Sequence, residues 1–136
     1  MTELKGVGAL KFIKRVDSIF IPVKDIKESE EWYKKVFDLT VVYRSEDNIG
    51  FRFNEPWPLK TGLSLYKSEE AGKPSPVHFN FYTEDVDGFY QYLSDEGVEP
   101  DEVQSEDGMR FFDFHDPSGN RFNVVTFKEI ALEHID

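Results

Sequence analysis

Residues 77–85 decide how this chain folds, and they read Val-His-Phe-Asn-Phe-Tyr-Thr-Glu-Asp. Apolar and polar side chains alternate along this segment, and a period of two is typical of a β-strand whose faces meet different surroundings. The polar positions are His78, Asn80 and Tyr82, and the apolar positions are Val77, Phe79 and Phe81. We therefore predict a strand with one face in an apolar core and the other in a polar environment.

The same pattern occurs earlier in the chain. Residues 18–25 read Ser-Ile-Phe-Ile-Pro-Val-Lys-Asp, and Asp25 follows Ser18 at the spacing at which Asp85 follows His78. Self-similarity at a fixed distance indicates a repeated supersecondary unit. His78 and Ser18 are thus predicted to occupy equivalent positions.

Each of these strands leads into a predicted helix. Asp25 is the expected N-cap of the first helix, with Glu28 completing a capping box, and Asp85 is the expected N-cap of the second. Gly97 is expected just beyond the end of the second helix. Apolar residues at helical spacing are Ile26, Trp32, Tyr33, Val36 and Phe37 in the first helix and Val86, Phe89, Tyr90 and Leu93 in the second.

Further strands are predicted after each helix. The first half has strands at 16–23, 40–44, 49–54 and 62–67, and the second half continues with a weak edge strand within 94–107 and strands at 109–115 and 120–127. The fold class is therefore α+β, with two tandem βαβββ modules at 14–67 and 76–127. We expect them to form one compact domain, flanked by an N-terminal extension at 1–13 and a C-terminal tail at 128–136.

The acidic residues are concentrated in the second half. The 136 residues carry a net charge of −11; residues 1–75 contain 13 basic and 12 acidic side chains, whereas residues 76–136 contain 3 and 15. Such a chain repels phosphate backbones and anionic membranes, so neither nucleic acid nor a membrane is expected as a partner. Its field would attract a cationic ligand, unless the carboxylates serve only solubility.

The sequence contains no cysteine, which removes disulfides, thiolate metal sites and cysteine nucleophiles. No apolar run is long enough to span a membrane, and the first residues lack the apolar run of a secretion signal. The protein is therefore expected to be cytoplasmic.

Four segments in order resemble one family. They are residues 16–25 with Glu31-Trp32-Tyr33 after them, residues 77–85, Gly108-Met109-Arg110, and Asp116-Pro117-Ser118-Gly119-Asn120. Over residues 14–127 the chain resembles the vicinal oxygen chelate superfamily, which contains glyoxalase I, extradiol dioxygenases and bleomycin resistance proteins. The resemblance implies that the modules form an incompletely closed eight-stranded mixed sheet around a concave cavity. It also implies a homodimer, because family members often complete their cavities across a two-fold axis.

The resemblance also implies where a metal would bind. The family's ligands are commonly His, Glu or Gln, His and Glu, and the corresponding positions here are Ser18, Ser64, His78 and Asn123, of which only His78 matches. Hydroxyl and amide oxygens supply no negative charge, so this set would hold a divalent transition metal weakly. No metal site and no other cofactor are expected.

His78 is left with three interpretations: a lone ligand in a degenerate metal site, a hydrogen-bonding or acid–base group in a metal-free pocket, or a polar residue without a role. Polar residues predicted on the same face favour the second. Arg110 either holds an anionic group at the cavity mouth or pairs with a nearby carboxylate. Phe79, Phe81 and Phe122 are expected to face the helices. The expected ligand-binding residues are Ser18, Phe20, Ser64, Tyr66, His78, Asn80, Tyr82, Arg110 and Asn123.

These observations predict a protein that binds a small organic molecule in its cavity without the family metal. The alternative is a metal-dependent lyase of the glyoxalase type or a dioxygenase. The catalytic residues and the identity of the ligand are not predicted by the sequence.

Overall fold

The computed structural model describes residues 16–54, 61–74 and 78–128. The chain divides into two compact units, Met1–Ala71 and Gly72–Asp136. The extension predicted at 1–13, Val77 and residues 129–136 of the predicted tail lie outside the described residues.

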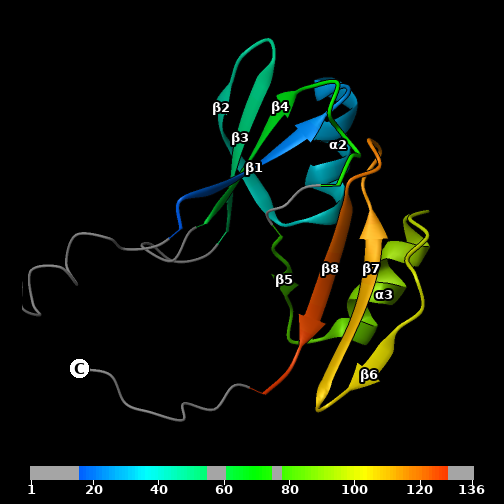
Figure 1. Cartoon of the computed structure of the whole chain (residues 1–136). Helices are drawn as coiled ribbons and strands as arrows, with labels where there is room; N and C mark the ends of the chain where they lie inside the picture. The colour runs from blue at the N-terminus through cyan, green and yellow to red at the C-terminus, as the bar shows by residue number, and fades with distance from the viewer. Residues whose placement is uncertain (1–15, 55–60, 75–77, 129–136) are drawn as a thin grey trace, which may run out of the picture. The chain divides into compact units, whose positions relative to one another are not determined.

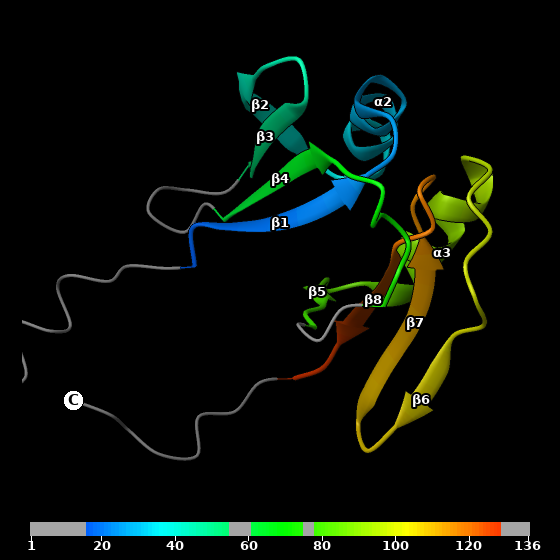
Figure 2. The same cartoon turned by 45° about the horizontal axis from the view of Figure 1, so that its top comes forward.

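The first unit consists of a mixed four-stranded sheet and one helix (Figures 1 and 2). The strand order is β1-β4-β3-β2, with β1 parallel to β4 and the other pairs antiparallel. The elements are β1 (Ser18–Val23), α2 (Ile26–Val36), β2 (Leu39–Arg44), β3 (Asn48–Phe53) and β4 (Gly62–Lys67).

The alternation predicted for the first strand is confirmed in β1. Ile21 and Val23 are buried, whereas Phe20, which precedes Ile21, is 69 % exposed. The helix after β1 begins where the capping signal places it, because the Asp25 carboxylate accepts a hydrogen bond of 2.8 Å from the Glu28 N–H. One face of the sheet is thereby covered by α2.

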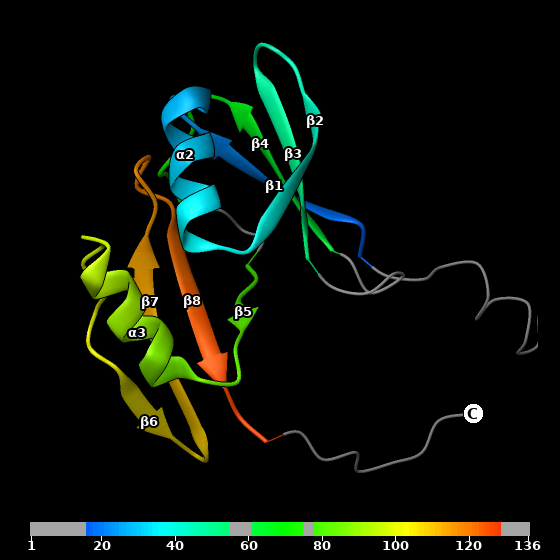
Figure 3. The same ribbon diagram turned by 180° about the vertical axis from the view of Figure 1, so that it is seen from behind.

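The second unit has the same plan (Figure 3). Its sheet has the order β5-β8-β7-β6, with β5 parallel to β8 and the other pairs antiparallel, and α3 lies across β7 and β8. The elements are β5 (Phe81–Tyr82), α3 (Val86–Asp95), β6 (Gln104–Glu106), β7 (Met109–His115) and β8 (Arg121–Thr126).

The helix α3 also has the predicted boundaries. The Asp85 carboxylate accepts a hydrogen bond of 2.9 Å from the Gly88 N–H. At the other end Gly97 has a φ of +87°, a left-handed conformation that glycine adopts without steric cost. Phe89 on the buried side of α3 stacks on Phe112 of β7 with ring centroids 5.9 Å apart.

The strand predicted within 77–85 is much shorter than expected. Only Phe81 and Tyr82 pair with β8, although exposure still alternates, with His78 and Asn80 exposed and Phe79 half-buried. The strand lies at the sheet edge and has a single, parallel neighbour, and parallel pairing is slightly less stable per residue. The pattern therefore predicted correctly which of these side chains are exposed, but it overestimated the number of residues that pair with the neighbouring strand.

The predicted turn between β7 and β8 is built around Asp116, which is 5 % exposed. Its carboxylate accepts hydrogen bonds from the N–H groups of Ser118 (2.9 Å) and Asn120 (2.8 Å) and from the Asn120 amide (2.9 Å). The side-chain oxygen Oδ1 of Asn120 in turn accepts from the N–H of Gly72 at 3.0 Å. The turn thus joins the start of the second unit to the β7–β8 hairpin.

The predicted fold class is confirmed: the chain is α+β, with two mixed four-stranded sheets, neither of them closed. Within each unit one face of the sheet is covered by the unit's helix, and we call the opposite face the open face. No helix in the described ranges is long and apolar enough to cross a membrane.

Candidate functional site

The open face of the second unit contains a pocket of about 490 Å³. It is formed by β7, β8 and the segment that leads into β5. The lining residues are His78, Phe79, Asn80, Asp113, Arg121, Phe122 and Asn123. Hydrogen-bonding side chains from three segments therefore meet beside the edge of the aromatic core.

The β7–β8 register brings the polar residues of the pocket together. Asp113 pairs directly with Asn123, and Arg121 lies two residues from Asn123 on the same face of β8. Phe112 and Phe114 alternate with Asp113 and contact the Phe89 ring of α3. Because the side-chain period of a strand is two, burying these aromatic rings under the helix turns Asp113 to the open face.

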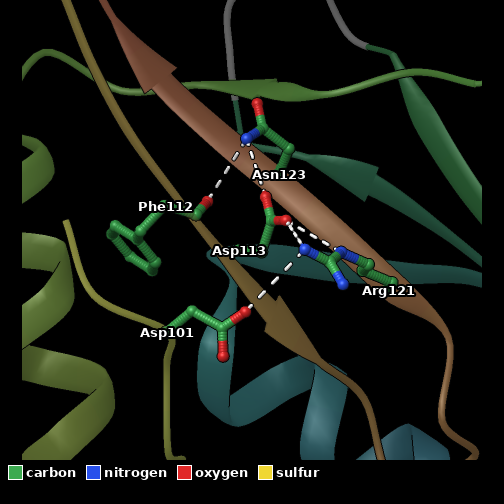
Figure 4. A network of polar contacts seen from close by, with 5 residues as sticks. All are labelled: Asp101, Phe112, Asp113, Arg121 and Asn123. Carbon is green, nitrogen blue, oxygen red and sulfur yellow. Dashed lines mark hydrogen bonds and ion pairs between the residues drawn. The ribbon is translucent and has the colours of Figure 1, made fainter. Parts of the chain in front are cut away.

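Asn123 is hydrogen-bonded through both ends of its amide. Its Nδ2 donates to Asp113 Oδ1 at 2.8 Å and lies 3.5 Å from the carbonyl of Phe112 (Figure 4). Its Oδ1 accepts from the amide of Asn80 at 3.3 Å. The amide is therefore fixed in one orientation between Asp113 and the segment before β5.

Arg121 is held by carboxylates (Figure 4). Its Nε donates to Asp113 Oδ2 at 2.8 Å, its Nη2 contacts the same oxygen, and Nη2 lies 3.9 Å from Asp101. The hydrogen bond to Asp113, followed by the charges of both carboxylates, raises the pKa of Arg121 above its ordinary value. The pocket thus contains an ion pair beside the amide of Asn123.

Of the nine residues expected to bind a ligand, the pocket brings together His78, Asn80 and Asn123. The sequence analysis did not assign Asp113 or Arg121 to the site, because their partnership depends on strand register. Phe79 and Phe122 were expected only as core. They do pack together, with ring centroids 5.9 Å apart, but they also line the pocket.

Two expected residues of the second unit lie outside the pocket lining. The Arg110 side chain binds Asp87 of α3, with Nη2 2.6 Å from Oδ1, and also donates to Ser105. This is the carboxylate pairing that the sequence left open, and it places Arg110 on the helix side of the sheet. Tyr82 donates from its hydroxyl to the carbonyl of Phe127 at 3.3 Å.

The remaining expected residues lie on the open face of the first unit. The hydroxyls of Ser18 and Ser64 are 2.8 Å apart and form a hydrogen bond. Phe20 is the register partner of Ser64, and Tyr66, 37 % exposed, follows on the same face of β4. These four side chains therefore form a continuous surface on β1 and β4.

This surface continues across the sheet through residues that the sequence did not indicate. Gly50 of β3 pairs with Ser64, and Tyr43 of β2 pairs with Gly50. A Cβ atom at Gly50 would lie 3.5 Å from Tyr43 Cβ and 3.8 Å from Ser64 Oγ, which is ordinary contact distance. Two small residues, Ser64 and Gly50, thus separate the exposed rings of Phe20 and Tyr43.

A family model described as the glyoxalase/bleomycin resistance protein/dioxygenase superfamily matches residues 15–124. The chain belongs to this superfamily. The resemblance inferred from the sequence is therefore confirmed. No curated protein sequence matches the chain.

Several solved structures of the superfamily fold resemble this chain. Fosfomycin resistance protein FosX from Mesorhizobium loti is 19 % identical with a TM-score of 0.66, over 85 % of this chain and 94 % of that one. Lactoylglutathione lyase from Agrobacterium tumefaciens is 20 % identical with a TM-score of 0.68, over 85 % and 96 %. FosX from Listeria monocytogenes, complexed with Mn(II) and sulfate, is 18 % identical with a TM-score of 0.69, over 85 % and 92 %. At these identities the likeness shows the fold alone.

The superfamily's metal does not fit the residues present at its usual positions. The hydroxyls of Ser18 and Ser64 are hydrogen-bonded to each other. Asn123 contributes a neutral amide that is already hydrogen-bonded to Asp113 and Asn80. In the part of the chain that the structure describes, no three His, Asp or Glu side chains are grouped so that they could hold a metal ion. His78 is the one imidazole in this set of positions, and a divalent transition metal needs several nitrogen or charged ligands.

Proposed function

We propose that this superfamily member binds a small organic molecule in the pocket of the second unit, without a resident metal. The observation that carries the proposal is the composition of the pocket. A volume of about 490 Å³ lies within the range of small-molecule sites, which combine apolar walls with a few fixed polar groups.

The polar groups are preorganised. Asn123, Asp113 and Arg121 satisfy one another, so they keep their positions when no ligand is bound, and little side-chain entropy is lost on binding. His78 and Asn80 are exposed beside them and are available to solvent or to a ligand. Phe79, which is half-buried, supplies apolar area. A flat, partly polar molecule would match this combination.

The alternative is a metal-dependent lyase of the glyoxalase type or a dioxygenase. The names of the similar structures, which include a lactoylglutathione lyase and a Mn(II) complex of FosX, are the reason to keep it. The donor set at the usual metal positions argues against it. We therefore expect the purified protein to contain far less than one transition metal ion per chain.

Metal analysis and ligand titration together test the proposal. Inductively coupled plasma mass spectrometry measures zinc, nickel, iron and manganese per chain, and NMR titration with phenethylamine, 2-phenylethanol and phenylacetate measures binding. We expect at least one probe to shift the amide resonances of 78–80, 113 and 121–123, and His78→Ala to weaken that probe. His115→Ala is the matched control, since His115 is exposed on β7 but does not line the pocket.

Two results would contradict the proposal. The first is the absence of pocket shifts with all three probes. The second is about one tightly bound metal ion per chain that His78→Ala removes but His115→Ala retains, which would favour the enzymatic alternative.

We also propose a cytoplasmic homodimer. The supporting features are the absence of cysteine and the exposed outer strand β2, on which Val42 and Tyr43 are each 57 % exposed. Light scattering at several concentrations tests the dimer, and a strictly monomeric mass would refute it.

A further inference from the structure

We propose that the pocket selects small organic cations, such as aromatic ammonium ions, over carboxylates of the same shape. The inference rests on the proposed function, because it names the ligand class of the same pocket. Three observations carry it: the negative charge of the second unit, the neutralisation of Arg121 by two carboxylates, and the acceptor positions that remain open on Asp113.

The net negative charge of the chain lies in the second unit. Residues 1–71 contain 12 basic and 12 acidic side chains, whereas residues 72–136 contain 4 and 15, so the whole net charge of −11 is carried by the second unit. Charges on one surface sum to a potential that raises the local concentration of ligands of opposite sign. An organic cation would therefore be attracted to the unit that contains the pocket.

Arg121 does not offer the pocket a net positive charge. It is the only basic residue among those lining the pocket in the described part of the chain. Two carboxylates, Asp113 and Asp101, lie within ion-pair distance of its guanidinium. The three groups together carry one net negative charge. A carboxylate ligand would thus meet a guanidinium that is already neutralised and two carboxylates that repel it.

Asp113 keeps room for a donor. A carboxylate has about four acceptor positions. Oδ2 accepts from Nε and Nη2 of Arg121, while among the described residues Oδ1 accepts only from the Asn123 amide. The Asp113 side chain is 22 % exposed and lines the pocket. An ammonium group is therefore able to donate to Oδ1 without breaking an existing bond.

Phe79 borders the pocket and is half-buried, so it offers apolar area to a ligand's ring. The Phe122 ring itself packs in the core against Phe81 and Phe114. The exposed Asn80 side chain adds a neutral acceptor, because its Nδ2 is the atom that donates to Asn123. Charge and hydrogen bonding thus favour one class of molecule.

The three probes named above differ in charge but share a phenyl ring and a short chain, so they test this inference directly. With the full chain at low salt, we expect phenethylamine to bind about tenfold or more tightly than phenylacetate, with 2-phenylethanol between them. Added salt should reduce the difference, because part of it is long-range.

Asp113→Asn should abolish most of the preference for the amine, since the substitution removes the negative charge and keeps the size of the side chain. Glu99→Gln, which changes an exposed carboxylate of the same unit outside the pocket lining, is the matched control and should leave the preference nearly unchanged. If Asp113→Asn does not fold, the salt dependence in the native chain remains a test of its own.

The outcomes separate the two proposals. Tightest binding of phenylacetate in the pocket, or an amine preference that neither salt nor Asp113→Asn reduces, would overturn the cation selectivity and leave the proposed pocket in place. Failure of all three probes to shift pocket resonances would overturn the proposed function, and the selectivity with it.

Discussion

The open faces of the two units differ in charge, whereas the faces under the helices are alike. In the first unit the face is uncharged at its centre, where the Ser18 hydroxyl is hydrogen-bonded to the Ser64 hydroxyl between exposed aromatic rings. In the second unit the equivalent face carries the ion pair of Asp113 and Arg121. The opposite faces, under the helices, remain alike: both are apolar and both meet a stacked aromatic ring.

This difference shows which parts of a duplicated fold are constrained. A residue under the helix must fill a close-packed volume, so its size and polarity are restricted. A residue on the open face contributes little to that packing and is free to change its charge. The two units therefore share one architecture, and the charged pocket found among the described residues lies in the second.

The largest expected effect on stability tests whether the cores of the two units contribute equally to the free energy of unfolding. Phe51 and Phe112 are each 1 % exposed, and each stacks on a ring of its own helix, Tyr33 or Phe89. Changing either to alanine should lower the free energy of unfolding by about 3–5 kcal/mol. Urea denaturation measures this loss, and hydrogen exchange shows which unit it opens. A loss below about 1 kcal/mol for one of them would show that the cores are not equivalent.

The matched N-caps give a smaller effect. Asp25 and Asp85 each accept one backbone hydrogen bond at the start of a helix. We expect Asp25→Ala and Asp85→Ala each to lower the unfolding free energy by about 1 kcal/mol, and each corresponding Asp→Asn variant to lose less, since asparagine also caps. Thermal denaturation of the four variants checks this. An alanine variant no less stable than its asparagine counterpart would contradict the capping role.

One position breaks the similarity of the two buried faces. Ser29 of α2 is 1 % exposed, and its hydroxyl has no hydrogen-bond partner among the described residues, whereas α3 has Phe89 at the equivalent position after its cap. Ser29→Ala removes an unsatisfied buried oxygen and should stabilise the protein by about 1 kcal/mol. A rise in the urea midpoint at unchanged slope would confirm it, and a fall would mean that the hydroxyl is satisfied in solution.

The smallest effect concerns an ion pair of the first unit. The hydrogen bond from Arg44 lowers the pKa of Glu30 below its ordinary value near 4.5, with Lys34 contributing as well. A lowered pKa in the folded state stabilises the protein above the unfolded value and is lost as the pH falls through the folded value. Glu30→Gln should therefore cost less than about 1 kcal/mol at pH 7 and nothing at strongly acidic pH. A difference that grows on acidification would refute this assignment.

The helices and most strands were predictable because their signals are local. An N-cap aspartate at the start of each helix, apolar residues at helical spacing and alternation along strands depend on neighbours within a few residues. For this reason the bounds of β4 and β7 were predicted as they are found, and those of β8 differed by one residue at each end. The length of β5 was wrong, because pairing depends on what lies beside the strand.

The partners across the site needed the tertiary structure. The sequence placed Asn123 and Ser18 on polar faces, since alternation alone decides the face of a strand. It did not indicate that Asn123 meets Asp113, or that Ser18 meets Ser64, because those contacts join residues 10 and 46 positions apart and are set by register. The sequence by itself thus determined both helices, every strand except the length of β5, the duplication and the acidity of the second half. Only the tertiary structure decided which side chains form the pocket, because strand register fixes contacts between residues distant in the chain.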